Sequence, residues 1–316
     1  MFDIPTVLMA DEILDKAFKK ASKVEYKGQT RMDTVRETNI SKVKSASDVI
    51  VSTMGKYVKA FPSIERLSPF YSELIDVAVS RDKVKKSLGA LDWCRGSVAR
   101  VARQTVKDMG SAKNLGRIDE LRRSSYGRMS SFVKQVSKEL EFLGRARNIM
   151  RKFPTVDPSL PTVVIAGAPN VGKSQLVGRI SSGKPRVAVY PFTTQEISVG
   201  VFERKYLRYQ VIDTPGLLDR PLAERNAIEL RAVLALKHLA NVIVFILDPT
   251  ETCGYTSEQQ RNLLESLREE FGPVPIIEVE NKADMQVSGS ERLKISAATG
   301  EGVPELVDAL VGRLKA

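Results

Sequence analysis

The second half of the 316-residue chain contains four short motifs, and their order constrains the fold more than any other feature. In chain order they are GAPNVGKS at 167–174, DTPG at 213–216, NKAD at 281–284 and SAA at 296–298. The first motif fits a phosphate-binding loop, which many nucleotide-binding proteins share, whereas the third narrows the base to guanine. Together the motifs predict an α/β P-loop domain with a mostly parallel sheet that binds GTP.

The phosphate loop at 167–174 lies between an apolar, β-branched run at 162–166 and a predicted helix that begins near Lys173. A strand, a glycine-containing loop and a helix in this order let backbone N–H groups face the α- and β-phosphates. We expect Lys173 to bind the β- and γ-phosphates and the Ser174 hydroxyl to ligate Mg²⁺. The other residues expected at the nucleotide here are Asn170, Val171, Gly172 and Gln175.

Two further segments are predicted to sense Mg²⁺ and the γ-phosphate. The Asp213 carboxylate is expected to hold Mg²⁺ through a water molecule, while the Gly216 N–H reaches the γ-phosphate. Between the first two motifs, one threonine should ligate Mg²⁺ through its hydroxyl. Thr194 is favoured over Thr193 because Gly200 follows it by six residues, a spacing similar to that of related GTPases. The predicted catalytic residues are Lys173, Thr194 and Gly216.

The base is expected to be recognised by the third and fourth motifs. The Asp284 carboxylate can accept hydrogen bonds from N1–H and the 2-amino group of guanine, two donors that adenine lacks. Adenine would leave a partly buried carboxylate unpaired, at a cost of about 1–3 kcal/mol or more. Lys282 should lie along the plane of the base, and the Ala297 N–H should contact O6. The remaining residues predicted at the base are Asn281, Ser296 and Ala298.

Two positions bear on the rate of hydrolysis. Leu217 follows the second motif at the position where many GTPases carry the glutamine that orients the attacking water. Because leucine cannot hydrogen-bond water, intrinsic turnover should be slow or should need another group. The side-chain carbonyl of Asn170 could help to bind K⁺ near the β- and γ-phosphates, as it does in some GTPases, or Asn170 could be a structural loop residue.

The first half of the chain predicts helices. Apolar residues recur at helical spacing before residue 153, which favours a basic antiparallel helical bundle over 1–153. One helix should begin at Pro69, because proline is favoured at the first helical position, and the last helix should run from about 118 to 152. The proline-rich segment 154–160 predicts a linker, and 161–316 the nucleotide-binding domain.

Positive charge is concentrated in one stretch. The net charge of the chain is +11, and residues 81–152 contain 19 Lys and Arg against 7 Asp and Glu. Such a block favours binding to a phosphate backbone through counterion release, although a solvated helix face is the alternative. Aromatic residues are sparse in the block, so contacts to the backbone and shape of folded RNA fit better than base stacking. The candidate RNA-binding residues are Arg122, Arg123 and Arg128.

Other features narrow the class of protein. No run of eighteen or more uncharged apolar residues is present, and the first residues are typical neither of a secretory signal nor of a transit peptide. Cys94 and Cys253 are expected to be free thiols, so we expect a cytoplasmic protein without membrane contacts. Buried packing is expected for Trp93 and Cys94.

The motifs and several longer segments closely resemble the nucleolar GTP-binding (Nog) family among the Obg-like GTPases. The resemblance rests on residues 10–18, 167–174, 190–194, 213–221, 224–229 and 235–239. It implies a switch that hydrolyses GTP to GDP and phosphate during assembly of the large ribosomal subunit, with the helical domain on rRNA.

The ligands expected from the motifs are GTP or GDP and Mg²⁺, with K⁺ as a candidate ion at Asn170, and the partners that the resemblance implies are rRNA and the large-subunit precursor. We expect a monomer off the ribosome, and the chain is most similar to the short archaeal form, which ends after the GTPase domain. The alternatives are another RNA- or translation-associated GTPase, or a protein that holds the nucleotide with negligible turnover.

Overall fold

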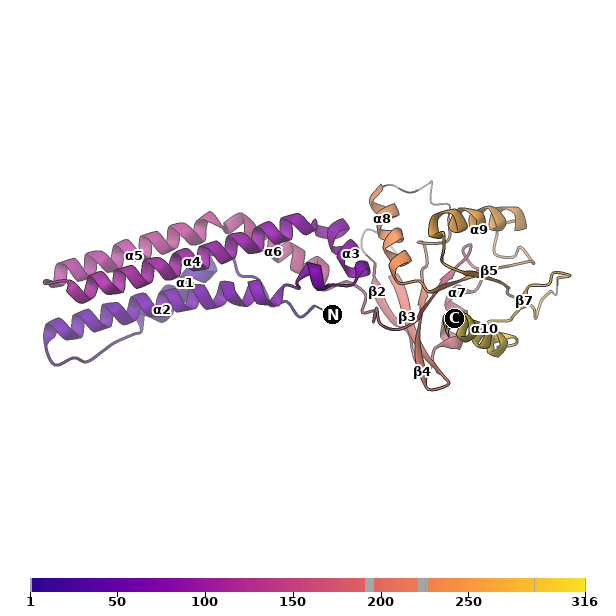
Figure 1. Ribbon diagram of the computed structural model, residues 1–316, viewed down its shortest axis with the longest axis horizontal. Coiled ribbons are helices and arrows are strands. Elements are labelled where there is room, and N and C mark those ends of the chain that lie inside the picture. Colours follow the sequence, from indigo (N-terminus) through magenta and orange to yellow (C-terminus); the bar gives the residue numbers. More distant parts are fainter. Residues whose placement is uncertain (1, 191–195, 221–224, 226, 287, 316) are drawn as a thin grey trace. The chain divides into compact units, whose positions relative to one another are not determined.

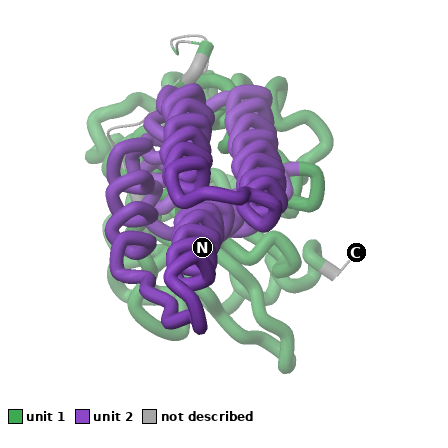
Figure 2. Tube along the Cα trace, turned by 90° about the vertical axis from the view of Figure 1, so that its left-hand side faces the viewer, with its two compact units in different colours: residues 1, 65–78, 152–316 green, residues 2–64, 79–151 purple. Residues whose placement is uncertain are grey.

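The computed structural model describes residues 2–190, 196–220, 225, 227–286 and 288–315 (Figure 1). Contacts divide the chain into two compact units (Figure 2). The sheet unit contains residues 65–78 and 152–316, and the helical unit contains residues 2–64 and 79–151. The structure confirms the predicted fold class, a helical N-terminal part followed by an α/β part with a mostly parallel sheet.

The helices of the N-terminal part are α1 (Ala10–Ser22), α2 (Arg31–Ala60), α3 (Pro69–Val79), α4 (Arg81–Ser111), α5 (Leu115–Gln135) and α6 (Ser137–Met150), with a short 3₁₀ helix η1 (Ile64–Arg66). Three of these helices, α2, α3 and α5, begin where the sequence supplies local signals. The Thr30 hydroxyl caps α2 by accepting from the Asp33 N–H at 3.1 Å, and the Asn114 carbonyl oxygen caps α5 in the same way. Helix α3 begins at Pro69, as predicted.

The long helix predicted from about 118 to 152 is wrong, because the chain breaks it at Val136. There φ is −101° and ψ is 19°, and the Val136 N–H bonds to the carbonyl of Val133 at 3.3 Å. The Ser137 hydroxyl donates to the Lys134 carbonyl at 2.7 Å, a local bond that competes with the helical ladder. Since Val136 is itself buried, packing holds the break in place.

Two other features of the N-terminal part depart from the sequence pattern. Cys94 is buried as predicted, but the prediction for Trp93 is wrong, since 49% of its surface is exposed. Its ring packs edge-on against the ring of Phe132, at 5.7 Å between centroids. Helix α3 lies inside the range predicted for the bundle, but its residues 69–78 group with the sheet unit.

The sheet unit is built on a twisted sheet with the strand order β2-β3-β4-β1-β5-β6-β7. The strands are β1 (Thr162–Ala166), β2 (Arg186–Val189), β3 (Glu196–Arg204), β4 (Leu207–Asp213), β5 (Val242–Leu247), β6 (Ile276–Glu280) and β7 (Leu293–Lys294). The helices are α7 (Lys173–Ile180), α8 (Ala227–Ala235), α9 (Ser257–Phe271) and α10 (Val303–Lys315), with a 3₁₀ helix η3 (Leu236–His238). Strands β2, β3 and β4 pair antiparallel, and all other neighbours pair parallel.

The predicted strand at 162–166 is confirmed as β1, and all of its residues are buried. A β-branched run that is buried on both faces is typical of the centre of a parallel sheet. Because β1, β4, β5 and β6 run parallel, their carboxyl ends meet at one edge, where ligands bind in open α/β sheets. Ile165 of β1 lies directly beside Asp213 of β4, so the first two motifs emerge side by side. No helix in the described ranges is both long and apolar enough to cross a membrane.

Candidate nucleotide site

The phosphate loop packs tightly against its neighbours at two glycines with positive φ. Gly167 has φ 138°, and a Cβ there would lie 2.5 Å from the carbonyl oxygen of Ile246 in β5. Gly172 has φ 100°, and a Cβ there would lie 2.3 Å from Nδ2 of Asn281. Only glycine fits at either position, because both the backbone conformation and the space exclude a side chain. Asn170 also adopts a left-handed conformation, with φ 61°.

Lys173 is buried at the first position of α7, and its ammonium group bends back over the loop. Its Nζ donates to the carbonyl oxygens of Gly167 at 2.9 Å and Ala168 at 2.7 Å. Burial lowers the pKa of Lys173, and the nearby Asp219 and Asp213 carboxylates oppose this shift. The Lys173 ammonium group therefore lies within the loop that was predicted to hold phosphates.

Asp213 and Ser174, both predicted at Mg²⁺, lie next to each other in the structure. Asp213 is fully buried and its Oδ2 accepts a hydrogen bond from the Ser174 hydroxyl, whereas its Oδ1 has no hydrogen-bond partner in the described part of the chain. Burial raises the pKa of Asp213, and the Ser174 hydroxyl and the Lys173 charge oppose the shift. An unpaired carboxylate oxygen beside a hydroxyl fits Mg²⁺, a cation that prefers oxygen ligands.

Among the described residues, Asp213 and Ser174 are the ligands predicted for this ion. Within the described ranges, no group of three or more His, Cys, Asp or Glu side chains could hold a metal. Mg²⁺ typically uses one or two protein oxygens and completes its shell with phosphate oxygens and water. The residues therefore fit a cation that binds together with a nucleotide.

The segment after Asp213 is held by two charged side chains that the sequence reasoning missed. The Gly216 N–H donates to Oδ2 of Asp219 at 2.8 Å. Arg225 donates through one guanidinium nitrogen to the carbonyl oxygens of Gly216 at 3.2 Å and Leu217 at 2.5 Å. The side chain of Leu217 is fully buried. Thr193 and Thr194, predicted near Mg²⁺, lie outside the described residues.

Asn281 links three of the motifs. Its Nδ2 donates to the Val171 carbonyl oxygen at 2.7 Å, and its Oδ1 accepts from the Ala297 N–H at 2.8 Å. The side chain is buried, so both bonds are shielded from water. The Ala297 N–H, predicted at O6 of the base, is thus engaged by Asn281 in this structure, and Ala298 beside it is exposed.

Lys282 is fixed by an acidic residue that the sequence reasoning did not identify. Its Nζ bonds to Oδ2 of Asp248 at 2.6 Å and to the Thr252 hydroxyl at 2.7 Å. Asp248 is buried at the end of β5; burial raises its pKa, but hydrogen bonds from Lys282, Thr250 and the Cys253 N–H outweigh this effect and lower it. The signal was present, since an acidic residue directly follows the apolar run at 242–247.

Asp284 differs from its predicted setting. The side chain is exposed in the structure and not partly buried as predicted. Of the other predicted residues, Gln175 lies on the exposed side of α7, while Ser296 is fully buried and accepts from the Thr299 N–H at 3.1 Å. The structure thus gathers the four motifs at one edge of the sheet.

The candidate RNA-binding arginines lie together on α5, but two of them share a carboxylate. Arg122 and Arg123 bond to Asp119 at 2.5 Å and 2.8 Å, and they hold its pKa below the usual range. The Arg122 guanidinium also lies 5.5 Å from the centre of the Tyr126 ring. Arg128 is exposed. Part of the predicted positive charge is therefore neutralised locally.

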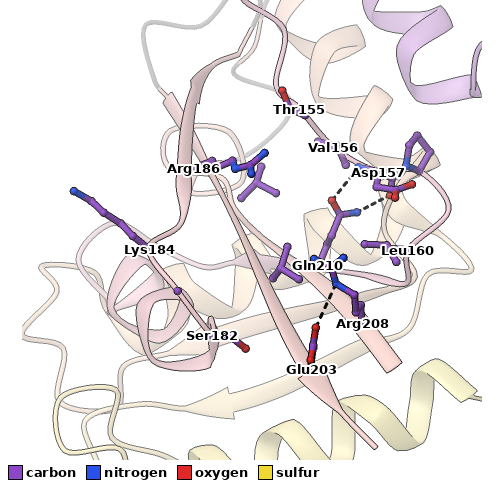
Figure 3. A pocket seen from close by; sticks show the side chains of 14 residues that line it. Thr155, Val156, Asp157, Leu160, Ser182, Lys184, Arg186, Glu203, Arg208 and Gln210 are labelled. Carbon is purple, nitrogen blue, oxygen red and sulfur yellow. Dashed lines mark hydrogen bonds and ion pairs between the residues drawn. The ribbon is translucent and has the colours of Figure 1, made fainter. Parts of the chain in front are cut away.

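A cavity of about 580 Å³ lies between the linker and the sheet (Figure 3). Gln210 of β4 forms part of its wall and bonds to the Asp157 backbone, at 3.0 Å to the N–H and 2.7 Å to the carbonyl oxygen. None of the described residues that line the cavity belongs to the four motifs. The cavity is therefore separate from the candidate nucleotide site, and Gln210 attaches the linker to the sheet.

Comparisons with known proteins give one consistent family. A family model for the NOG1 N-terminal helical domain matches residues 2–157, and a model for nucleolar GTP-binding protein 1 (NOG1) matches residues 227–284. An uncharacterised protein of Methanocaldococcus jannaschii is 38% identical over 89% of this chain and 80% of its own length. Nucleolar GTP-binding protein 1 of Encephalitozoon cuniculi is 37% identical over 93% of this chain.

Nucleolar GTP-binding protein 1 of Drosophila melanogaster is 34% identical over 96% of this chain. The chain spans about half the length of these two relatives, 56% of the former and 45% of the latter. The two family models together match most of the helical part and the segment from α8 to the third motif. The two family models name the family, and the chain covers 80% of the M. jannaschii relative at 38% identity. The chain therefore belongs to the NOG1 family.

Proposed function

We propose that this protein binds GTP with Mg²⁺, hydrolyses it slowly to GDP and phosphate, and acts as a switch in assembly of the large ribosomal subunit. The observation that carries the nucleotide part is the pair of buried bonds from Asn281 to Val171 and Ala297. These bonds fix the base motif, the phosphate loop and the fourth motif as one site. Such preorganisation favours binding because little order has to be gained when the ligand arrives.

The phosphates would lie in the loop that Lys173 crosses. Loop N–H groups and the N-terminus of α7 favour negative charge, and the Lys173 ammonium would exchange its two carbonyl acceptors for β- and γ-phosphate oxygens. Ser174 and Asp213 would hold Mg²⁺, with the Asp213 carboxylate acting through water. When bound, the ion would neutralise charge that develops on the phosphate oxygens.

The base would be read by Asp284 and flanked by Lys282. Since Asp248 and Thr252 hold the Lys282 ammonium, its aliphatic stem is fixed in place as a surface for the base. The exposed Asp284 carboxylate would gain its partners from the guanine N1–H and 2-amino groups. We propose Ala297 or the adjacent Ala298 as the N–H donor to O6, the former at the expense of its bond to Asn281.

Slow turnover is supported by Leu217, whose apolar side chain is buried and cannot orient water. Asn170, with its left-handed backbone in the phosphate loop, remains our candidate for a K⁺ ligand that would assist hydrolysis. Thr194 and Gly216 are proposed to contact the γ-phosphate. A protein that holds the nucleotide with negligible turnover is the second candidate, and the buried Leu217 is what favours it.

The proposed switch would reach the helical unit through α3. Arg231 of α8 pairs with Glu73 at 3.1 Å and Asp76 at 2.8 Å, so α8, which follows the second motif, is bound to α3. The Tyr71 hydroxyl also binds the linker, with 2.9 Å bonds to the carbonyls of Pro154 and Val156. Because α3 continues directly through Ser80 into α4, a shift of α8 would act on the first helix of the basic stretch.

The ribosomal part of the proposal comes from the relatives named nucleolar GTP-binding protein and from the basic stretch at 81–152. We propose rRNA and the large-subunit precursor as partners, with Arg122, Arg123 and Arg128 among the contacts. We also propose a cytoplasmic protein that is monomeric off the ribosome. Cys94 and Cys253, both within the described part, form no disulfide, which agrees with a reducing compartment.

Sedimentation with purified large-subunit precursors tests this function. The protein is mixed with precursors in the presence of GDP or a non-hydrolysable GTP analogue, and the bound fraction is compared. We expect a nucleotide-dependent fraction, together with GTP hydrolysis that the particles stimulate. Equal sedimentation in both states would contradict the switch, and hydrolysis that particles do not increase would favour the nucleotide-holding alternative.

A further inference from the structure

The Gly216 N–H, which is proposed to read the γ-phosphate, is bonded to an acidic side chain of the same segment. Oδ2 of Asp219 accepts this hydrogen bond at 2.8 Å, three residues along the chain. A carboxylate oxygen is an anionic acceptor of the same kind as a phosphate oxygen. Gly216 has φ 70°, in the left-handed region that glycine adopts readily.

The Asp219 charge also lies close to the phosphate-binding cation. Among the charges that act on Lys173, Asp219 makes the largest opposing contribution to the fall in its pKa that burial causes. Asp219 also contributes to the raised pKa of Asp213, so its charge is near the proposed Mg²⁺ position. The carboxylate therefore lies in the field of the same groups that the γ-phosphate would use.

The two peptides that follow the Gly216 N–H are held independently. Arg225 donates to the carbonyl oxygens of Gly216 and Leu217, and only 9% of its surface is exposed. The guanidinium thus restrains the two peptide planes that directly follow the one whose N–H group Asp219 binds. One amide hydrogen cannot serve two anions, and a carboxylate beside a γ-phosphate repels it.

We propose that Asp219 determines the preference between di- and triphosphate, because its carboxylate competes with the γ-phosphate for the Gly216 N–H. This inference rests on the proposed function, since it assumes a guanine nucleotide in the site. GTP has to displace the carboxylate, whereas GDP leaves it in place. After hydrolysis, return of the carboxylate to the N–H would favour release of phosphate.

The test compares the wild-type protein with Asp219→Asn, which keeps the size of the side chain and removes its charge. Calorimetry with Mg²⁺ gives the Kd for GDP and for a non-hydrolysable GTP analogue. For the variant we expect the ratio of the analogue Kd to the GDP Kd to fall by about tenfold, with the GDP Kd unchanged. Asp308→Asn removes the same charge from the surface of the sheet unit and should leave the ratio unchanged.

Two results would overturn the inference. One is an unchanged ratio in Asp219→Asn, whether neither nucleotide or both nucleotides bind more tightly, and the other is the same change of the ratio in Asp308→Asn. Lack of GDP binding by the wild-type protein would instead defeat the proposed function, so the two failures are distinguishable.

A second readout uses the amide resonance of Gly216 in the wild-type protein and in Asp219→Ser, a smaller variant. In the GDP complex, the variant should shift this resonance, whereas in the complex with the analogue both proteins should give the same value. A resonance that the variant leaves unchanged in the GDP complex would contradict the proposed contact.

Discussion

The phosphate loop and the arginines of α5 are both predicted ligand-binding regions, but the protein holds their side chains in opposite ways. Lys173 of the loop and Asp213 at the end of β4 are buried, and Oδ1 of Asp213 has no hydrogen-bond partner in the described part of the chain. On α5, Arg122 and Arg123 lie at the surface and already share Asp119. A motif thus predicts where the side chains of a site lie. An excess of positive charge predicts only a tendency to bind RNA, because nearby carboxylates can pair with the cations.

The largest expected effect is on nucleotide affinity, at the base-binding end of the candidate nucleotide site. Asp284→Asn replaces an acceptor pair with one acceptor and one donor, which suits xanthine better than guanine. We expect GTP affinity to fall by about 10-fold to 100-fold and affinity for xanthosine triphosphate to rise. Competition binding with both nucleotides measures the shift, with Asp308→Asn as the control. Unchanged selectivity for GTP would contradict the assignment of Asp284.

Replacing Arg122, Arg123 and Arg128 with glutamate tests the second region. RNA association should weaken, and the slope of log affinity against log salt should flatten by about one to two, since Asp119 already offsets part of the charge. Asp119→Asn provides the matched opposite change and should strengthen association, because it frees two guanidinium groups. Retained affinity and slope in the glutamate variant would mean that this stretch is only a solvated surface.

A smaller effect on precursor binding is expected at Arg231, which joins α8 to α3 and is the proposed connection between the nucleotide site and the basic helices. Arg231→Ala removes both ion pairs to α3 without touching the four motifs. GTP affinity should stay within about twofold, while the difference in precursor binding between GDP and GTP states should shrink by about threefold. Arg204→Ala removes a different ion pair of the sheet unit, to Asp308, and is the control. A full nucleotide-dependent difference in Arg231→Ala would exclude this connection.

The smallest effect is on stability. Burial raises the pKa of Asp213 in the folded protein, so its ionised form opposes folding, and stability is lost as the pH rises through the raised pKa. Asp213→Asn removes this penalty and should raise the Tm of the nucleotide-free protein by about 2–4 °C at neutral pH. The same variant should lose Mg²⁺-dependent nucleotide binding. Thermal unfolding with and without Mg²⁺ and GDP measures both effects, and a lower Tm would contradict the proposed penalty.

The sequence predicted best those features that depend on neighbours along the chain. The strand at 162–166 and the start of α3 at Pro69 were predicted because a β-branched run and a helix-initiating proline act locally. The break at Val136 was not, since the packing of that residue against the helical core is part of what holds it.

The same division applies to the candidate site. The four motifs could be named in advance because each is a short pattern in the sequence. The parallel strands of the sheet then bring them to one edge. Arg225 and the pairing of Asp248 with Lys282 were missed because these contacts form only on folding, and Asp219 was missed although its partner lies three residues away. Trp93 is a case in which the residue type misled the prediction. Its apolar ring suggested burial, but the ring lies half exposed at the surface of the helical unit.

Calorimetry of the full chain with GTP, GDP and ATP under saturating Mg²⁺ tests the central claim most directly. Saturable heat with GTP and GDP, and none with ATP at the same concentrations, is the result that we expect from the clustered motifs. Absence of heat with both guanine nucleotides, or equal binding of ATP, would contradict the account.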